Sequence, residues 1–306
     1  LLEDSGYLAR AAFVVDKLMY KLGLHGKSFI PMLIGFGCNI PGVMATRTID
    51  SEKDRILTIL VNPLMSCSAR LPVYVLIGGA VLGPYAAAGT YAMYILGIFL
   101  AVLMALLFRR TIPYFKGKPS PFILELPMYS KPVFKSTLIH MWERGSLFLR
   151  KAGTIILAGI IVVWFLSSYP WGAPLEETYL AMLGHGLEPV FRPLGFDWRG
   201  AVGLFFGFIA KEIVVGSFAV IFGLGEESRM EEIQEIIRNR GVFTPLTGFA
   251  FMAFTLIYIP CVATVGVIYR ETNSWKWTLF SVIYGLILAY ITSLAIILIG
   301  QGLGYR

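Results

Sequence analysis

The sequence predicts an all-α, polytopic membrane domain with re-entrant or broken helices and an internal repeat. Hydrophobic residues make up 57% of the 306 residues and charged residues only 15%, whereas soluble proteins are about 45–50% apolar and about 25% charged. The mean hydropathy is +0.72, and apolar segments long enough to cross a bilayer recur along the chain. This composition excludes a disordered, fibrous, coiled-coil or disulfide-rich secreted protein.

Five apolar segments reach the roughly 20 residues that a helix needs to cross a bilayer core of about 30 Å. Only the first of them contains a charged residue, Arg70. Each segment is therefore expected to be a membrane helix. The five segments are 56–83, 90–108, 152–169, 243–269 and 277–303.

Two further apolar segments differ from plain membrane helices. Segment 28–46 is uncharged but is interrupted by two prolines and three glycines, and segment 200–225 holds Lys211 and Glu212 at its middle. Irregular backbone at membrane depth persists only where protein or a water-filled cavity satisfies its polar groups. We therefore expect 28–46 to be re-entrant or unwound, and 200–225 to be either broken or spanning.

Two segments have the pattern of surface helices. Residues 5–23 repeat apolar side chains at helical spacing with basic residues on another face, which predicts an amphipathic helix at the membrane interface. Residues 226–240 alternate charges with Met and Ile, which predicts a short, solvated connecting helix. The chain begins at Leu1 within an apolar phrase, so we expect it to be a portion of a longer protein.

The net charge of +7 comes from one loop, because the stretch from Arg109 to Lys151 holds nine Lys or Arg and two Glu. The positive-inside rule places this loop, residues 111–151, in the cytoplasm. Nucleic acid is not an expected partner, because basic faces with aromatic residues are missing elsewhere. The side of the C-terminus stays open. A re-entrant 200–225 would invert the two halves and place it outside, and a spanning one would place it inside.

The order of segments predicts an internal repeat. Gly35-Phe36 and Gly207-Phe208 lie in the two interrupted segments, and a cysteine-containing span follows each. Interrupted helices at matching positions of two halves point to a transporter site near the middle of the membrane. The predicted organisation is a first repeat over 1–110, the basic loop over 111–151 and a second repeat over 152–306.

All three cysteines, Cys38, Cys67 and Cys261, lie at breaks or polar kinks of membrane segments. An odd number without any CxxC pair argues against a disulfide framework and against structural zinc. Sulfur together with carbonyl oxygens freed by a helix break would suit a loosely held divalent first-row metal. The alternative for each is a small buried cysteine that only fills space at a kink.

Other polar residues are candidates for assisting roles. Asn39 and Ser68 neighbour two of the cysteines, and Arg70 shares a helix face with Cys67. Buried intramembrane charges are functional by default, so Glu212 is a candidate ligand or gate. Lys211 and Arg70 are candidates for gating or ion pairing. The alternative for Lys211 and Glu212 is an ion pair that only fixes helix packing.

No catalytic or cofactor-binding constellation is evident. Residues 26–28, Gly-Lys-Ser, resemble the end of a phosphate-binding loop, but Lys21 occupies the place of its first glycine and a helix precedes it. The three histidines are His25, His140 and His185, and all are expected at the surface.

Six phrases of the sequence resemble the membrane domain of the bacterial ferrous iron transport protein B (FeoB) family, and the resemblance covers nearly the whole chain. They are LEDSGYLAR at 2–10, HGKSF at 25–29, GFGCNIP at 35–41, MSCSARLP at 65–72, GFIAKE at 207–212 and IPCVAT at 259–264.

This resemblance implies two gate modules, similar to nucleoside-transporter repeats, that move Fe²⁺ inward across the bacterial cytoplasmic (inner) membrane. It places the motif cysteines of the family, as ligands along the iron path, at Cys38, Cys67 and Cys261. It also implies a cytosolic G-domain, where GTP and Mg²⁺ would bind, and small FeoA-like and FeoC-like partners. The lipid bilayer is the expected surrounding, and a homo-oligomer stays open.

Two other functions fit the residues less well. An organic-solute carrier, for instance for nucleosides, would need polar side chains able to recognise a ribose and a base, and few are available in the membrane segments. A non-transporting scaffold or sensor would dock a cytosolic domain on the loop between residues 109 and 151. An intramembrane enzyme ranks last.

Overall fold

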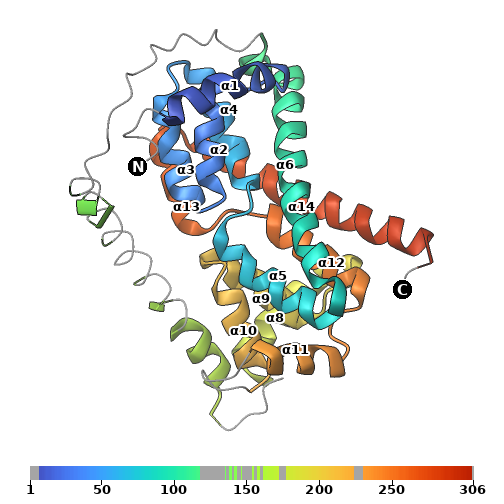
Figure 1. The fold of residues 1–306 in the computed structure, drawn as a ribbon. Coiled ribbons are helices and arrows are strands. Elements are labelled where there is room, and N and C mark those ends of the chain that lie inside the picture. The colour runs from blue at the N-terminus through green and yellow to red at the C-terminus, as the bar shows by residue number, and fades with distance from the viewer. Residues whose placement is uncertain are drawn as a thin grey trace. The chain divides into compact units, whose positions relative to one another are not determined.

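The computed structural model describes residues 7–117, 161–171, 177–223 and 230–304, together with isolated residues between 135 and 158. In these ranges every regular element is a helix (Figure 1). The chain forms two compact units. Unit 1 falls within Leu1–Met65, Ile98–Thr154 and Gly266–Trp277, and unit 2 falls within Ser66–Gly97, Ile155–Val265 and Thr278–Arg306.

The first half of the chain alternates short helices with one long one. In order they are α1 (Tyr7–Lys21), α2 (Phe29–Gly35), α3 (Asn39–Ala45), α4 (Glu52–Val61), α5 (Leu71–Val81) and α6 (Ala86–Thr111). Short 3-10 turns lie at Gly26–Ser28, Thr46–Thr48, Asn62–Leu64, Ser68–Arg70, Gly83–Tyr85 and Pro113–Phe115.

The second half follows the same alternation and ends in the longest helix. Its helices are α8 (Tyr179–Phe191), α9 (Trp198–Ile209), α10 (Ile213–Ile221), α11 (Met230–Asn239), α12 (Pro245–Ile257), α13 (Val262–Thr272) and α14 (Trp275–Gly302), with a 3-10 turn at Arg192–Leu194.

Four helical stretches of the described residues are long and apolar enough to cross a membrane. The expected segment 152–169 is described only in part, and 161–168 is helical. The four stretches are Glu52–Val81, Gly83–Thr111, Pro245–Thr272 and Trp275–Gly302.

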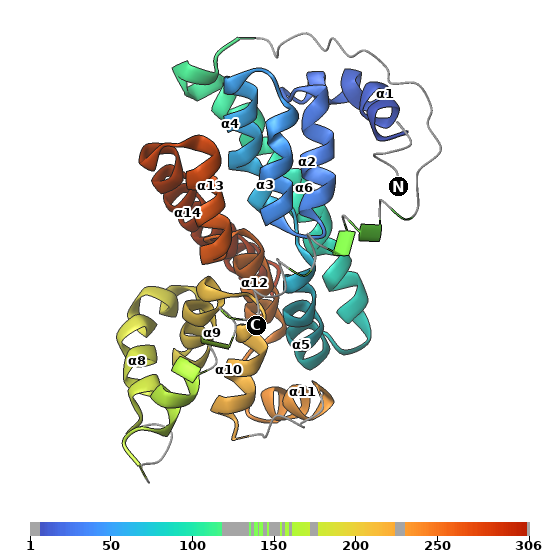
Figure 2. The ribbon, with the colours of Figure 1, turned by 90° about the vertical axis from the view of Figure 1, so that its left-hand side faces the viewer.

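Each interrupted segment forms two short helices that pack on each other. In segment 28–46 these are α2 and α3, which lie side by side in both views (Figure 1 and Figure 2). Their backbones approach closely at Gly42, where an added Cβ would lie 3.0 Å from the Pro31 carbonyl oxygen. In segment 200–225 the two helices are α9 and α10, and the helix is interrupted between them around Lys211 and Glu212.

Two spans that the sequence predicts as continuous helices are broken. Segment 56–83 divides into α4 and α5, and segment 243–269 divides into α12 and α13. Proline has no N–H to donate to the helical hydrogen-bond pattern. Pro63 lies four residues before Cys67, and Pro260 lies directly before Cys261. Each break therefore divides its span into two helical arms and places a cysteine at the start of the second arm.

The two halves share one order of elements and one backbone detail. Each has a first helix, a pair of short helices, a broken span and a long helix, namely α1 to α6 and α8 to α14 with α11 added. At the tip of the first pair, Cys38 has φ −154° and ψ 132°. At the tip of the second pair, Ala210 has φ −152° and ψ 137°. Gly35 and Gly207 each precede their tip residue by three positions.

Each unit combines arms from both halves of the chain. In unit 1, Ile268 of α13 packs against Val43 of α3 and Ile59 of α4. In unit 2, α5 packs against α10 and α12, and Gly248 of α12 faces Ile77 and Val81. The second arm of each broken span therefore packs on the short helices and the first arm of the other half.

Two segments of the second half differ from the sequence interpretation. The helix α8 lies in the stretch 170–199, for which the sequence analysis predicts no helix. The helix α11 was expected to be a solvated connector, but it binds the end of α5. Gln234 donates to the Val75 carbonyl at 2.9 Å, and Arg238 donates to the carbonyls of Gly79 at 2.8 Å and Ala80 at 3.0 Å. The two Arg238 donors satisfy carbonyls that a helix leaves free at its C-terminus.

In unit 1, a buried ion pair joins the first turn of α4 to the last turn of α6. Asp54 accepts from the Arg109 guanidinium, and their side chains are only 4% and 12% exposed. Removing one member of a buried pair leaves the other charge uncompensated. We expect Asp54→Asn to lower the free energy of unfolding by about 3 kcal/mol, measured by denaturation in detergent.

Asp50→Asn provides the control for this prediction. Asp50 also accepts from a lysine, Lys27, at 2.6 Å, but its side chain is 84% exposed, and exposed pairs contribute little. Equal losses of stability in the two variants would contradict a special role of the Asp54–Arg109 pair.

His25 is buried, contrary to the surface position expected for it, and its Nδ1 accepts from the backbone N–H of Lys27 at 3.0 Å. Burial lowers the pKa of His25, despite the nearby carboxylates of Asp16, Asp50 and Asp54. Below about pH 6.5, the usual His pKa, the unfolded chain binds this proton and the folded chain resists it. Stability is therefore expected to fall as the pH falls from about 7.5 to about 5.5.

The variant His25→Gln tests this pH dependence, because an amide oxygen can accept the same hydrogen bond and does not titrate. Thermal denaturation at the two pH values is expected to show a smaller loss for His25→Gln than for the unaltered chain. The same loss in both would assign the effect to other groups.

Candidate metal site

In unit 2, two of the candidate cysteines begin the second arms of the two broken spans. Cys67 is 9% exposed, and its carbonyl accepts from the Arg70 N–H at 3.1 Å, which starts the turn that leads into α5. Cys261 directly precedes α13, and its Sγ lies 3.1 Å from the Thr264 hydroxyl. Neither cysteine forms a disulfide, so both thiols are available as ligands.

The ammonium of Lys211 lies at the break between α12 and α13. Its Nζ donates to the Ile259 carbonyl at 3.0 Å and lies 3.1 Å from the centroid of the Tyr258 ring. The side chain is 97% buried, since the residue is only 3% exposed. A carbonyl and an aromatic face are both groups that stabilise a cation. These two contacts attach the tip between α9 and α10 to the broken span formed by α12 and α13.

The neighbours of Lys211 form an unusual charge cluster. The ionisable groups whose electrostatic field acts on Lys211 are Arg70, Cys67, Cys261 and Glu212. Arg70 is fully buried, so two cations and two thiols share one region of unit 2. In the described part of the chain Lys211 has no carboxylate within ion-pair distance, so no ion pair of Lys211 is formed there.

Tyr258 is held in place beneath Lys211 by two features of α9. Its hydroxyl donates to the Leu204 carbonyl at 3.1 Å. Gly207 provides the space, because a Cβ at this position would collide with the Tyr258 hydroxyl. The glycine that the sequence singles out as part of a repeated Gly-Phe pair therefore positions the aromatic ring of the site.

In unit 1, Cys38 lies at the tip between α2 and α3, beside a pair of buried asparagines. The Cys38 N–H donates to the Ile34 carbonyl at 3.0 Å, and its carbonyl accepts from Gly42 at 3.2 Å. Asn62 Nδ2 donates to the Asn39 carbonyl at 3.4 Å. The Oδ1 atoms of Asn39 and Asn62 are buried without a hydrogen-bond partner among the described residues. Amide oxygens in this state are potential acceptors for a cation or a water.

The remaining predicted residues are not buried. Ser68 and Glu212 are both exposed, and Glu212 forms no ion pair with Lys211. Among the described residues no three His, Cys, Asp or Glu side chains are grouped closely enough to hold a metal ion. Any metal bound at the two thiols of unit 2 therefore needs backbone carbonyls or other oxygen atoms to complete its coordination.

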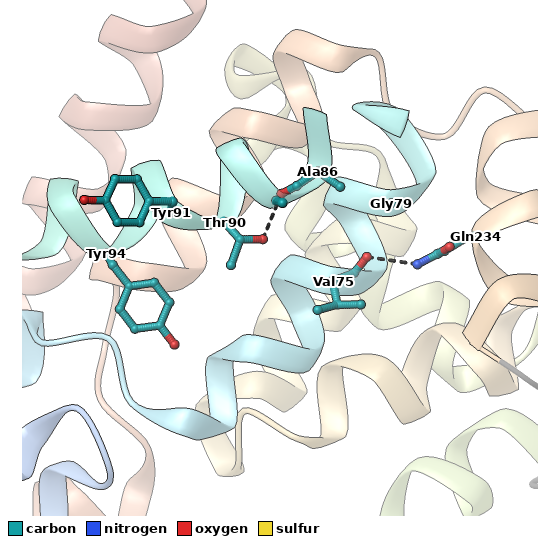
Figure 3. Close-up of a pocket in the computed structure, with 8 residues that line it drawn as sticks. Val75, Gly79, Ala86, Thr90, Tyr91, Tyr94 and Gln234 are labelled. Atoms are coloured by element: carbon teal, nitrogen blue, oxygen red, sulfur yellow. Dashed lines mark hydrogen bonds between the residues drawn. The ribbon is translucent and has the colours of Figure 1, made fainter. Parts of the chain in front are cut away.

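A larger cavity in unit 2 does not have the chemistry of a metal site. This groove of 510 Å³ lies between α5, α6 and α11 (Figure 3). Two of its polar side chains are already engaged, since Thr90 donates to the Ala86 carbonyl at 3.0 Å and Gln234 donates to the Val75 carbonyl. The groove contains no thiol and no charged side chain. Its lining residues are Val75, Gly79, Ala86, Ala87, Thr90, Tyr91, Tyr94 and Gln234.

Three groups of the site are absent from the sequence-based candidates. They are Asn62, Tyr258 and the Ile259 carbonyl. The prolines that follow Asn62 and Ile259 mark where the backbone leaves the helix and frees its carbonyls. This signal could have pointed to the Ile259 carbonyl. The asparagine and the tyrosine lie inside apolar segments and gave no local pattern.

Comparison with known proteins gives two family matches. A model described as "Nucleoside recognition" (Gate) matches residues 1–81 and 149–275, which together make up more than half of the chain. A second model, the C terminus of ferrous iron transport protein B, matches residues 90–144. The chain belongs to the FeoB family of gate-domain membrane proteins. The gate match includes all three cysteines and Lys211.

Relatives of the FeoB-family chain support this assignment. The "Fe(2+) transporter FeoB" of Methanocaldococcus jannaschii is 51% identical over 98% of the chain and 45% of the relative. A "Fe(2+) transport protein A/Fe(2+) transporter FeoB fusion protein" of Porphyromonas gingivalis is 44% identical over 98% of the chain and 41% of the relative. The FeoB of Staphylococcus aureus MSSA476 is 45% identical over 98% and 45%. The chain thus spans less than half the length of these relatives. No solved structure matches it.

Family membership and the long apolar helices both indicate that the FeoB-family chain is a membrane protein. Four described helical stretches are long and apolar enough to cross a bilayer, and the gate and FeoB matches both cover such stretches. The chain is a multi-pass protein of the cytoplasmic membrane, as the composition predicts for the membrane spans and the resemblance predicts for the kind of membrane.

Proposed function

We propose that the chain is the membrane domain of a ferrous iron transporter and that Fe²⁺ moves inward through it across the cytoplasmic membrane. The relatives that carry the name Fe(2+) transporter support this function. The observation that carries the proposal is a lysine nitrogen bound at a helix-break carbonyl in unit 2, because the Ile259 carbonyl that accepts from Lys211 lies two residues before Cys261.

The proposed ligands are Cys38, Cys67 and Cys261, assisted by backbone carbonyls at the helix breaks. Thiolates and carbonyl oxygens together suit a borderline divalent ion that must be released again. Asn39 would add an amide oxygen next to Cys38. Ser68 and Glu212, which are exposed, would contact the ion on its way to or from the buried ligands.

We further propose that the full-length protein couples this transport to a cytosolic G-domain, which would bind GTP and Mg²⁺. The Porphyromonas gingivalis relative is named as a fusion with Fe(2+) transport protein A, which supports a small FeoA-like partner. A FeoC-like partner and a homo-oligomer belong to the same proposal. We assign no catalytic residue to the present chain.

Uptake into proteoliposomes tests the proposed substrate. The full-length protein that contains this chain would be reconstituted, and uptake of Fe²⁺ under anaerobic conditions would be measured beside uptake of uridine. We expect Fe²⁺ to accumulate and uridine not to. Uridine uptake without Fe²⁺ uptake would establish a nucleoside-like carrier, and uptake of neither with GTP present would favour a scaffold or sensor.

A further inference from the structure

The end of α12 has the properties of a cation site even without a bound metal. The helix ends at Ile257, and Pro260 supplies no N–H for the carbonyls of the last turn. These carbonyls carry the negative end of the helix dipole, which attracts positive charge. In unit 2 the Lys211 nitrogen lies just beyond this helix end, 3.0 Å from the carbonyl of Ile259, two residues after the helix.

We propose that Lys211 is a tethered cation that holds the place of the transported metal ion at the Ile259 carbonyl, and that it must withdraw before a divalent cation binds beside Cys67 and Cys261. This inference rests on the proposed function, because it takes the two thiols as ligands of the cargo. It assigns Lys211 a competing role. The sequence interpretation made the lysine a candidate for gating or for ion pairing.

Electrostatics requires the exchange. Lys211 is buried and is flanked by a second buried cation, Arg70. Charges interact strongly in the water-poor interior of a membrane protein. A divalent ion that joined both cations at the thiols would be repelled by each of them. Withdrawal of Lys211 removes one positive charge and at the same time frees the Ile259 carbonyl as a ligand.

The location of Lys211 allows such a withdrawal. The residue lies at the tip between α9 and α10, where the chain is extended at Ala210 and not helical. Its long side chain is held by one hydrogen bond and by the face of Tyr258. Movement of this tip or rotation of the side chain would release the carbonyl without disturbing either helix.

The first half of the chain provides a comparison within the same protein. Counting from the repeated Gly-Phe pairs, the position that corresponds to Lys211 is Asn39. There the side chain is neutral, and the contact with the broken span comes from Asn62, which donates to the Asn39 carbonyl at 3.4 Å. A built-in cation is therefore a feature of the second tip and is not repeated at the first.

Titration of the purified chain with Co²⁺ tests the proposal, because absorption bands between cobalt and sulfur report ligation by cysteine. The variant Lys211→Leu removes the ammonium without adding a metal ligand. We expect it to bind Co²⁺ at least about ten-fold more tightly than the unaltered chain, which corresponds to about 1.4 kcal/mol. Lys211→Arg keeps the charge and is expected not to bind more tightly. Lys276→Leu, at an exposed lysine of α14, controls for net charge.

Equal or weaker Co²⁺ binding by Lys211→Leu would overturn the role of Lys211. If that binding still depended on Cys261, the proposed iron path would stand. Absence of Co²⁺ binding in every variant would contradict both proposals. If Lys211→Leu fails to fold, a second measurement on the unaltered chain tests the proposal. In the unaltered chain, modification of Lys211 by an amine-reactive reagent is expected to increase when Co²⁺ binds, and protection that Co²⁺ does not change would overturn the exchange.

Discussion

Replacing Cys38 and Cys67 together by serine is expected to lower Fe²⁺ uptake by the full-length protein at least about ten-fold while leaving the fold intact. Loss even of the groups that support metal ligands costs about 10–100-fold, and these two residues are proposed as ligands themselves. Serine has nearly the same size as cysteine but is a poorer ligand for a borderline metal. Initial uptake rates in proteoliposomes, normalised to reconstituted protein, provide the measurement.

Thr90→Ser is a matched control for the double variant. It makes a similarly small change in a membrane helix, and Thr90 bonds only within its own helix, to the Ala86 carbonyl at 3.0 Å. Its uptake is expected to match that of the unaltered protein. If the double cysteine variant also transports at the unaltered rate when equally expressed, the two thiols are not ligands.

Gly42→Ala is expected to destabilise unit 1 by about 3 kcal/mol, the upper end of the cost of overpacking. The added Cβ would lie 3.0 Å from the Pro31 carbonyl oxygen, 3.1 Å from the Gly35 nitrogen and 2.7 Å from Asn62 Nδ2. Two of these atoms are backbone, so α2 and α3 would have to separate. Because Cys38 lies at the tip of this pair, the variant is also expected to lose metal uptake. Thermal denaturation in detergent would measure the loss of stability.

Gly266→Ala separates this steric effect from the general consequence of adding a methyl group to a helix. Gly266 lies in α13, also in unit 1, and a Cβ there would meet nothing within 4 Å. Alanine favours a helix over glycine by up to about 1 kcal/mol, so this variant is expected to be neutral or more stable. A Gly42→Ala chain as stable as Gly266→Ala would show that α2 and α3 are not closely packed in the native protein.

Much of the architecture could be predicted from local pattern. The length and hydropathy of the apolar segments predict the membrane helices. The prolines and glycines of segment 28–46 predict an irregular element where α2 and α3 lie. The sequence also shows a proline at each of the two breaks, Pro63 and Pro260. We expected continuous helices there, because each span as a whole is apolar and long enough to cross a bilayer.

The partners of polar residues could not be predicted in the same way. Lys211 donates to a carbonyl 48 positions away along the chain, and no local pattern encodes such a contact. His25 is buried by long-range packing in unit 1 although its neighbours in sequence resemble a loop. The helix α8 was missed because its sequence, with two glycines and a proline, is a poor local match to a helix.

The exchange of arms between the two halves has a consequence for the mechanism. Cys67 belongs to the first half by sequence but to unit 2 by packing, and it therefore shares a unit with Cys261 and Lys211. Transporters built from repeats commonly bind substrate where interrupted helices of both halves meet. In unit 2 the second arm of the first broken span and the break of the second one contribute to one cluster.

Anaerobic binding of Fe²⁺ to the purified chain in detergent tests the central claim most directly, beside a variant in which Cys38, Cys67 and Cys261 are all changed to serine. The account predicts that the unaltered chain binds Fe²⁺ and that the triple variant loses this binding while it keeps the same thermal stability. Equal binding by both chains would contradict the claim and move the site to Glu212, Asn39 or the carbonyls at the helix breaks.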